Sequence, residues 1–187
     1  AWEVIRLANL HPRVNLHTPG PGVGGHCIAV DPWFIIEKYP DDTEIITLGR
    51  KINDSMPEYT VEHIRKIVEG IGNPKIAILG VTYKGNIDDT RESPAVKIIA
   101  WLEKIGIKYS IYDPHVREFK YELSSLKKTF KEADCAVILA NHDEFRFLHP
   151  AEIGKLMRNK VLFDTRFCVD HNLWKQNGFK VYCLGVG

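Results

Sequence analysis

Residues 75–81 read KIAILGV, an apolar run of strand length with a glycine near its end. Four runs of the same kind follow: YSIYD at 109–113, CAVILA at 135–140, KVLFD at 160–164 and KVYCLGV at 180–186. Continuous apolar strands that alternate with amphipathic helices are typical of a parallel sheet covered on both faces. We therefore expect residues 73–187 to form a doubly wound, Rossmann-like α/β domain with five parallel strands.

The helix between the first two runs carries recognisable end signals. Ser93 and Pro94 fit the N-cap and the first helical position, and Gly106 fits the residue just beyond the C-terminus. These signals predict a helix over residues 93–105.

Residues 1–72 lack such strands, and we expect them to be part of an all-helical domain. Residues 1–9 read as the end of a helix, residues 12–32 as a loop rich in glycine and proline, and residues 43–70 as a long helix. Pro57 should kink or restart that helix. Its apolar side chains recur at helical spacing, which leaves two roles open: a core helix or a helix through which two copies form a dimer.

Composition and charge exclude several classes of protein. The 187 residues include 25 basic and 24 acidic side chains, for a net charge of +1. Nucleic-acid and anionic-membrane surfaces call for a clear basic excess, and no run approaches the length of a membrane span, so we expect neither partner. The four cysteines form no C-x-x-C pair. We therefore expect a reduced, cytoplasmic chain with no metal site.

The first candidate site is Cys27, which follows a glycine-rich turn over residues 19–25. Glycines allow main-chain N–H groups to approach a ligand closely. If a helix starts near Cys27, its N-terminus lowers the thiol pKa and favours a nucleophilic thiolate. Asp31 would then share a helix face with Cys27 and orient a water molecule or hold a proton. A structural turn with an incidental cysteine is the alternative.

The second and third candidates follow strands, at the edge where parallel α/β sheets bind ligands. The loop over residues 80–94 is too long for a G-x-G-x-x-G turn, and it carries Tyr83 to stack on a base and Lys84 and Arg91 to hold phosphates. A solvated, salt-bridged loop is the alternative. After the fourth strand, Arg166 in Asp164-Thr165-Arg166 suits bidentate phosphate contact.

Together these motifs resemble the UDP-sugar 6-dehydrogenase family over the whole chain. The family pattern Gly-Gly-x-Cys with Asp four residues later stands at residues 24–31, its aromatic-Lys and Asp-Asp/Thr-x-Arg-Glu-Ser signature at residues 83–93, and its Asp-x-Arg motif at residues 164–166. Within the family, His-Pro-Arg-Val-Asn at residues 11–15 and PGPGVGGHCIAVDPWF at residues 19–34 look like the branch that acts on UDP-N-acetyl-D-mannosamine. Val30 stands where glucose-specific relatives usually have Lys.

The resemblance implies a four-electron oxidation that uses NAD twice and a thioester on Cys27, with Asp31 assisting. It implies that Tyr83 and Lys84 contact the nucleotide sugar, that Arg166 contacts its UDP portion, and that Arg91 and Cys27 lie at the NAD. It also implies substrate contacts by a run of the glycine-rich loop: Thr18, Pro19, Gly20, Pro21, Gly22, Val23 and Gly24.

His11 and Arg13 match residues that reach the substrate of a neighbouring subunit, which favours the dimer-forming role of the helix over residues 43–70. The family's N-terminal NAD-binding domain and its catalytic Lys and Asn have no counterpart in the sequence. We therefore expect an incomplete part of the enzyme that does not turn over substrate alone. Three alternatives remain: a 6-dehydrogenase of UDP-glucose or UDP-GlcNAc, a non-catalytic UDP-sugar-binding or dimerisation module, and an oxidoreductase that binds NAD on residues 73–187.

Overall fold

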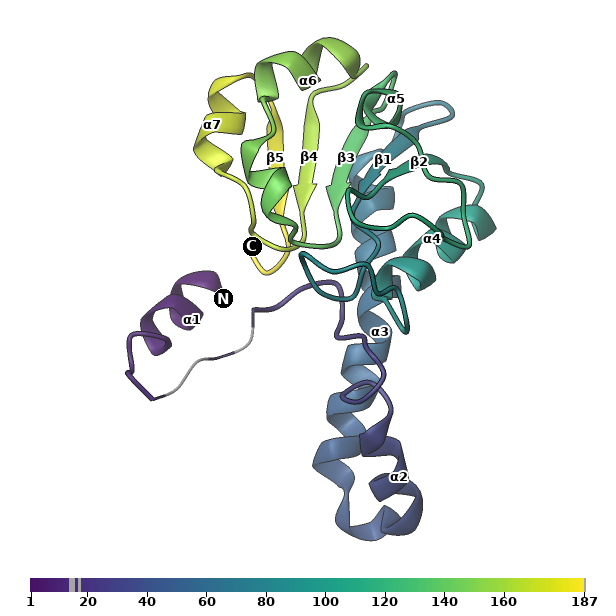
Figure 1. The fold of residues 1–187 in the computed structure, drawn as a ribbon, viewed down its shortest axis with the longest axis vertical. Helices are drawn as coiled ribbons and strands as arrows, with labels where there is room; N and C mark the ends of the chain where they lie inside the picture. Colours follow the sequence, from purple (N-terminus) through teal and green to yellow (C-terminus); the bar gives the residue numbers. More distant parts are fainter. Residues whose placement is uncertain (14–15, 17, 187) are drawn as a thin grey trace.

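The computed structural model describes residues 1–13, 16 and 18–186. Its centre is a sheet of five parallel strands in the order β2-β1-β3-β4-β5. The strands are β1 (Lys75–Leu79), β2 (Lys108–Tyr112), β3 (Cys135–Ile138), β4 (Val161–Asp164) and β5 (Lys180–Cys183). Each overlaps one of the five apolar runs, and the sheet sits at one end of the molecule (Figure 1). The predicted five-stranded parallel sheet is confirmed.

Helices cover both faces of the sheet. Side chains along each strand point alternately to the two faces, so each strand contributes to a core on either side. Ile76 and Ile78 pack in a core formed with α3 (Glu44–Ile67) and α4 (Pro94–Lys104). Ala77 and Leu79 pack in a second core formed with α5 (Leu126–Phe130), α6 (Pro150–Leu156) and α7 (His171–Gln176). All four strand side chains are fully buried. The doubly wound α/β architecture is confirmed.

The first covering helix of the sheet has the predicted ends. The Ser93 side chain accepts a hydrogen bond from the Ala95 amide at 3.2 Å, so it caps α4. Gly106 follows the C-cap residue Ile105 and has a φ of 73°, a left-handed conformation that glycine adopts without steric cost. Local sequence therefore determines both ends of α4.

The chain before the sheet is helical, with α1 (Trp2–Ala8), α2 (Asp31–Lys38), a 3-10 turn η1 (Pro40–Asp42) and the long α3. In Figure 1, α3 runs from the sheet to a far tip, where α2 lies beside it. The helix continues without a break through Pro57, so the predicted restart does not occur, and the alternative of a kink at that residue stays a prediction. Pro57 removes only one helical hydrogen bond, and its ring is buried.

The two halves of α3 lie in different surroundings. Val61 and Ile64, from its second half, are buried in the core beneath the sheet. In its first half Ile45, Leu48 and Ile52 are 87%, 59% and 55% exposed. The second half therefore has the core role that the pattern left open, while the first half presents an unpaired apolar stripe. The domain boundary after residue 72 stays a prediction. Within the described residues no helix is long and apolar enough to cross a membrane.

Candidate functional site

The candidate site forms at the carboxyl edge of the sheet, where the loops after β1, β3 and β4 meet. The strand order reverses between β1 and β3, and ligands of open α/β sheets bind at such a reversal. The loop after β1 is the long charged loop, the loop after β3 leads into a 3-10 helix η2 (Asp143–Phe147), and the loop after β4 carries Arg166. Two of the three predicted motifs therefore share this edge.

The glycine-rich turn packs directly on the loop after β1. Gly24 is buried so close to that loop that a Cβ on it would collide with the Glu92 carbonyl and press on Tyr83. The next amide, of Gly25, donates a hydrogen bond to the Arg91 carbonyl at 3.2 Å. A side chain at position 24 would push the two loops apart. The glycine-rich turn of Cys27 is thus joined to the loop after β1.

Arg166 lies beneath the start of the same turn, since a Cβ on Gly20 would run into its guanidinium. Its Nη2 donates to Asn141 Oδ1 at 3.0 Å, and its buried Nε has no partner in the described part of the chain. Burial lowers the pKa of Arg166 below its ordinary value. A desolvated guanidinium with an unused donor is suited to bind an anion such as a diphosphate.

Asp164, two residues before Arg166, is not a partner for that guanidinium. Its Oδ1 accepts the Arg166 backbone amide at 2.9 Å. Its Oδ2 accepts the Cys168 amide at 2.8 Å and faces His171 Nε2 at 3.0 Å. The carboxylate therefore shapes the loop after β4 and leaves the Arg166 side chain available.

Arg91 stands in a turn of the same kind but in a different electrostatic setting. Asp89 Oδ1 accepts the Arg91 amide at 2.9 Å, as Asp164 does for Arg166. Here the aspartate also holds the guanidinium, with 2.6 Å between Arg91 Nη2 and Asp89 Oδ2. Hydrogen bonds from Arg91 lower the pKa of Asp89 to about 2. Arg91 is exposed and paired, so an anion has to compete with Asp89 for it.

Cys27 is exposed in the turn that precedes α2. The predicted helix start near Cys27 is wrong, because α2 begins at Asp31. The Cys27 carbonyl accepts the amides of Val30 and Asp31 at 2.9 and 2.8 Å, so the segment forms a turn. Asp31 is an exposed residue at the first position of α2, one turn away from the thiol, and the two do not share a helix face.

The other three cysteines are less accessible than Cys27. Burial raises the pKa of Cys135 and of Cys168 above the ordinary thiol range. Burial also raises the pKa of Cys183 to about 11. Cys27 is thus the exposed thiol of the four, as a nucleophile requires.

His142 follows the β3 run at the same edge, where a lone histidine is more often structural than functional, and it anchors the loop after β1. It is fully buried, and its Nδ1 accepts the Asn86 amide at 2.9 Å, so the proton lies on Nε2. Nε2 faces Asp113 Oδ2 at 3.0 Å, and the Val81 amide donates to the same oxygen at 2.8 Å. Burial alone would raise the pKa of Asp113, but these hydrogen bonds outweigh it and lower the pKa.

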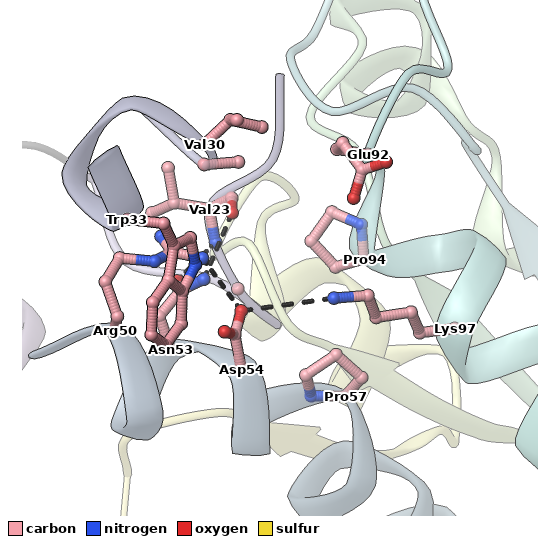
Figure 2. Close-up of a pocket in the computed structure, with 12 residues that line it drawn as sticks. Val23, Val30, Trp33, Arg50, Asn53, Asp54, Pro57, Glu92, Pro94 and Lys97 are labelled. Carbon is pink, nitrogen blue, oxygen red and sulfur yellow. Dashed lines mark hydrogen bonds and ion pairs between the residues drawn. The ribbon is translucent and has the colours of Figure 1, made fainter. Parts of the chain in front are cut away.

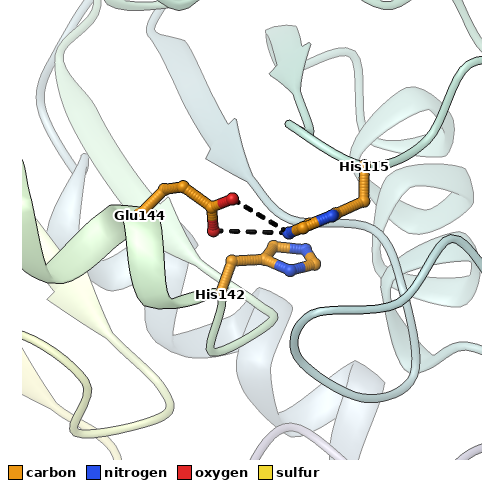
Figure 3. Close-up of side chains that lie close together, drawn as sticks. All are labelled: His115, His142 and Glu144. Carbon is orange, nitrogen blue, oxygen red and sulfur yellow. Dashed lines mark hydrogen bonds and ion pairs between the residues drawn. The ribbon is translucent and has the colours of Figure 1, made fainter.

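His142, His115 and Glu144 have side-chain nitrogens and oxygens within 4.8 Å of one another (Figure 3). This grouping does not fit a metal ion, because both nitrogens of His142 already face hydrogen-bonding partners. His115 Nε2 and Glu144 are themselves 3.1 Å apart. The cluster is therefore a hydrogen-bond network that fixes the loops after β1, β2 and β3.

The remaining predicted residues lie at the margin of this assembly. Lys84 is exposed on the loop after β1, and Thr18 is exposed at the start of the glycine-rich turn. His11 and Arg13 are exposed in the segment after α1, where the Arg13 amide donates to His11 Nδ1 at 3.2 Å. The next two residues of their motif, 14 and 15, lie outside the described residues.

Sequence reasoning also missed Asn141, the partner of Arg166. It directly follows the apolar run of β3, so its place at the carboxyl edge was a usable signal. His142 stands next to it, but nothing in the sequence marks its partner Asp113, 29 residues away.

Family profiles match both parts of the chain. Residues 77–171 match the UDP-binding domain of the UDP-glucose/GDP-mannose dehydrogenase family, and residues 1–55 match its central domain. The chain is 50% identical to a UDP-N-acetyl-D-mannosamine dehydrogenase of Methanocaldococcus jannaschii, and the match covers 100% of the chain and 44% of that relative. It is 38% identical to an NDP-N-acetyl-D-galactosaminuronic acid dehydrogenase of Ralstonia nicotianae, over 88% of the chain and 40% of that relative.

The fold is also similar to that of a solved UDP-D-ManNAc dehydrogenase from Pyrococcus horikoshii. The TM-score is 0.87 at 38% identity, and the match covers 98% of this chain and 44% of that one. The chain thus spans less than half the length of the relatives that it matches.

Proposed function

Since this chain belongs to the UDP-glucose/GDP-mannose dehydrogenase family, we propose that it is the UDP-sugar-binding and thiol-bearing part of an NAD-dependent 6-dehydrogenase. The proposed reaction oxidises UDP-N-acetyl-D-mannosamine to UDP-N-acetyl-D-mannosaminuronic acid. The observation that carries the proposal is the packing of the Cys27 loop on the loops of Arg91 and Arg166. That packing brings the loop of the exposed Cys27 against the loops of Arg91 and Arg166, which supports a single site that combines a nucleophile with an anion-binding cation.

In the proposed mechanism the chain binds the substrate by its charged end. The Arg166 guanidinium, beneath Gly20, donates hydrogen bonds to the diphosphate oxygens. Tyr83 and Lys84 contact the rest of the nucleotide sugar, and residues 18–24 line it. These contacts hold the C6 hydroxymethyl group beside Cys27, so that the reaction at C6 is intramolecular in effect.

The proposed chemistry runs through a covalent bond to Cys27. When bound, NAD takes a hydride from C6 in each of two oxidations, and Arg91 is the residue of this chain that would contact it. The C6 hydroxyl loses its proton to water in the first oxidation, which gives an aldehyde. The Cys27 thiolate adds to the aldehyde carbon. The second oxidation converts the resulting thiohemiacetal to a thioester, and the thiohemiacetal hydroxyl loses its proton to water. Water, oriented by Asp31, hydrolyses the thioester to the acid and the free thiol.

The structure gives a partial fit for NAD. The loop after β1 has no G-x-G-x-x-G turn, so it lacks the usual dinucleotide cradle. Arg91 is exposed and close enough to Cys27 for their charges to interact, which suits a cofactor diphosphate bound mainly by another domain. Titration of UDP against NAD on this chain tests the assignment; we expect binding of UDP, and tight binding of NAD alone would contradict it.

Self-association through the first half of α3 is part of the proposal. Ile45, Leu48 and Ile52 form an exposed apolar stripe there, which a second copy would bury. Sedimentation of Leu48→Glu against the unmodified chain tests it; a Leu48→Glu chain with the same mass in solution would contradict it. A reduced, cytoplasmic setting stays a prediction, consistent with four unpaired cysteines.

Activity is tested in the longest reading frame that contains this sequence. We expect two NADH per molecule of uronic acid formed from UDP-N-acetyl-D-mannosamine, and lower kcat/KM with UDP-glucose and UDP-GlcNAc. Cys27→Ser should abolish acid formation and spare UDP binding. If Cys27→Ser makes acid at the normal rate, the covalent mechanism is wrong. If no UDP-sugar is oxidised, a non-catalytic binding module is the better description.

A further inference from the structure

The turn that carries Cys27 is tied to α3 by a side chain that none of the motifs includes. Asn53 Oδ1 accepts the Val23 amide at 2.7 Å, and Asn53 Nδ2 donates to the Val23 carbonyl at 3.1 Å. In Figure 2 dashed lines join Asn53 of α3 directly to Val23 of the turn, at the edge of the cavity that both residues line. One side chain thus satisfies both polar groups of Val23, as a neighbouring strand would.

This contact is the main anchor of Val23, because its own side chain is 50% exposed and contributes little burial. The glycines on either side are buried against other parts of the protein. Flexible residues thus flank Val23, and a two-point hydrogen bond restricts them far more than one bond does. Asn53 therefore holds this part of the turn from the α3 side, while the loop after β1 holds Gly24 and Gly25 from the other side.

Arg50 supports the other side of the same turn from one helical turn earlier on α3. It is 8% exposed, its Nη2 pairs with Asp54 Oδ1 at 2.8 Å, and its Nη1 points to the Ile28 carbonyl at 3.5 Å. Ile28 follows Cys27 directly, whereas Val23 precedes Cys27 by four residues. The helix holds both flanks of the nucleophile, and a cavity of about 240 Å³ remains between them.

We propose that Asn53 is a positioning residue for Cys27. It keeps the thiol at the distance from the β1 loop at which Sγ attacks the aldehyde carbon before the aldehyde leaves. This inference rests on the proposed function, since it assumes a covalent step on Cys27. It goes beyond it by assigning a role to a helix residue outside every motif of the site.

The inference predicts a specific failure when Asn53 is removed. Small displacements of a reacting group slow an intramolecular step by about 10- to 100-fold. The first oxidation does not use the thiol and should continue. The aldehyde then waits for Sγ, and part of it escapes to solvent. We expect Asn53→Ala to lower kcat for acid formation by about 10-fold or more with KM for the UDP-sugar within about 3-fold.

The experiment measures NADH, acid and escaped aldehyde in the longest reading frame, with hydroxylamine present to trap aldehyde as its oxime. Unmodified protein should give two NADH per acid and no oxime. Asn53→Ala should give more than two NADH per acid, with one NADH of the excess for each oxime. Asn53→Asp, which keeps the acceptor for the Val23 amide and loses the donor, should fall between them.

Ser55→Ala is the matched control, because Ser55 lies on the same helix and its hydroxyl donates to the Ile52 carbonyl at 2.8 Å, its one partner among the described residues. It should behave as the unmodified protein. Thermal unfolding and UDP binding show whether each variant is folded. If Asn53→Ala does not fold, Asn53→Asp takes its place.

Two results would overturn the inference while leaving the proposed function intact. In one, Cys27→Ala stops acid formation, yet the Asn53 variants keep the normal kcat and two NADH per acid. In the other, they lose kcat with no oxime and with a matching loss of UDP binding, as a purely structural residue would. If Cys27→Ala still forms acid at the normal rate, the proposed function fails, and this inference fails with it.

Discussion

Replacement of Arg166 by Met tests whether Arg166 binds the ligand or stabilises the fold. Methionine fills a similar volume and removes the charge. The substitution removes one hydrogen bond, from Nη2 to Asn141, and it also removes a desolvated cation whose Nε has no partner. The lost bond costs about 1 kcal/mol, and relief of the buried charge offsets it. We expect a free energy of unfolding within about 1 kcal/mol of the unmodified chain.

UDP binding should respond very differently. Charge-assisted hydrogen bonds contribute about 1.5–3 kcal/mol each, so losing two of them from a guanidinium to a diphosphate in Arg166→Met should weaken UDP binding by about 10²- to 10⁴-fold. Isothermal titration measures the affinity, and urea unfolding measures the stability. Arg91→Met is the control, because Arg91 is exposed and already paired with Asp89. It should change the UDP affinity by no more than about 2-fold.

Either of two results would refute this reasoning. Unchanged UDP affinity in Arg166→Met would show that the unused donor does not face the ligand. A loss of more than about 3 kcal/mol of unfolding free energy would show that Arg166 holds the fold together.

Three further predictions test the loops and the buried network. Gly24→Ala should lower the free energy of unfolding by about 1–3 kcal/mol, because the added Cβ would collide with the loop after β1. Gly49→Ala on α3, where an added Cβ has no atom within 4 Å, should raise it by about 0.5–1 kcal/mol. Urea unfolding measures both. Iodoacetamide should alkylate Cys27 before Cys183, whose pKa burial raises to about 11, as mass spectrometry of timed samples would show. Asp113→Asn should be destabilising at neutral pH and progressively less so in acid. Because the pKa of Asp113 is lower in the folded than in the unfolded chain, its ionised form stabilises the fold at pH values above the unfolded-state pKa of about 4. This stabilisation is lost as the pH falls through the pKa of the folded state.

Each of these has a clear contrary outcome. Equal effects of the two glycine substitutions would mean that the loops are not in close contact. Alkylation of Cys27 and Cys183 at the same rate would show that the greater exposure of Cys27 does not make its thiol more reactive. A stability difference between Asp113→Asn and the unmodified chain that stays constant from neutral pH to below pH 4 would show that ionisation of this carboxyl does not matter to the fold.

The sheet could be predicted because its signal is local. Each apolar run is long enough to be a buried strand, and Ser93 with Gly106 marks a helix end without help from distant residues. The ends of the strands then place Arg91 and Arg166 on one edge, since parallel strands all end on the same side.

Contacts between distant segments could not be read in this way. His142 looks incidental until the fold brings Asp113 to it, and Asn53 looks like any polar residue of a helix until the turn at Val23 lies beside it. The first residue of α2, Asp31, could not be predicted from the sequence either, because a glycine-rich turn is compatible with a helix that begins at any of several residues. Pairings set by tertiary packing leave no mark in the spacing of either partner.

Because α3 is continuous through Pro57, it acts as a rigid spacer between the sheet and the far tip of the molecule (Figure 1). Its 24 residues span about 36 Å at the rise of an α-helix, and roughly the first half of that length projects beyond the sheet. If two copies join by their exposed stripes, this length fixes the separation of their two sheets. An insertion of one helical turn after Ile52 would lengthen α3 by about 5 Å in each copy, and so the spacing by up to about 11 Å, with each sheet unchanged; small-angle scattering would resolve a longer particle.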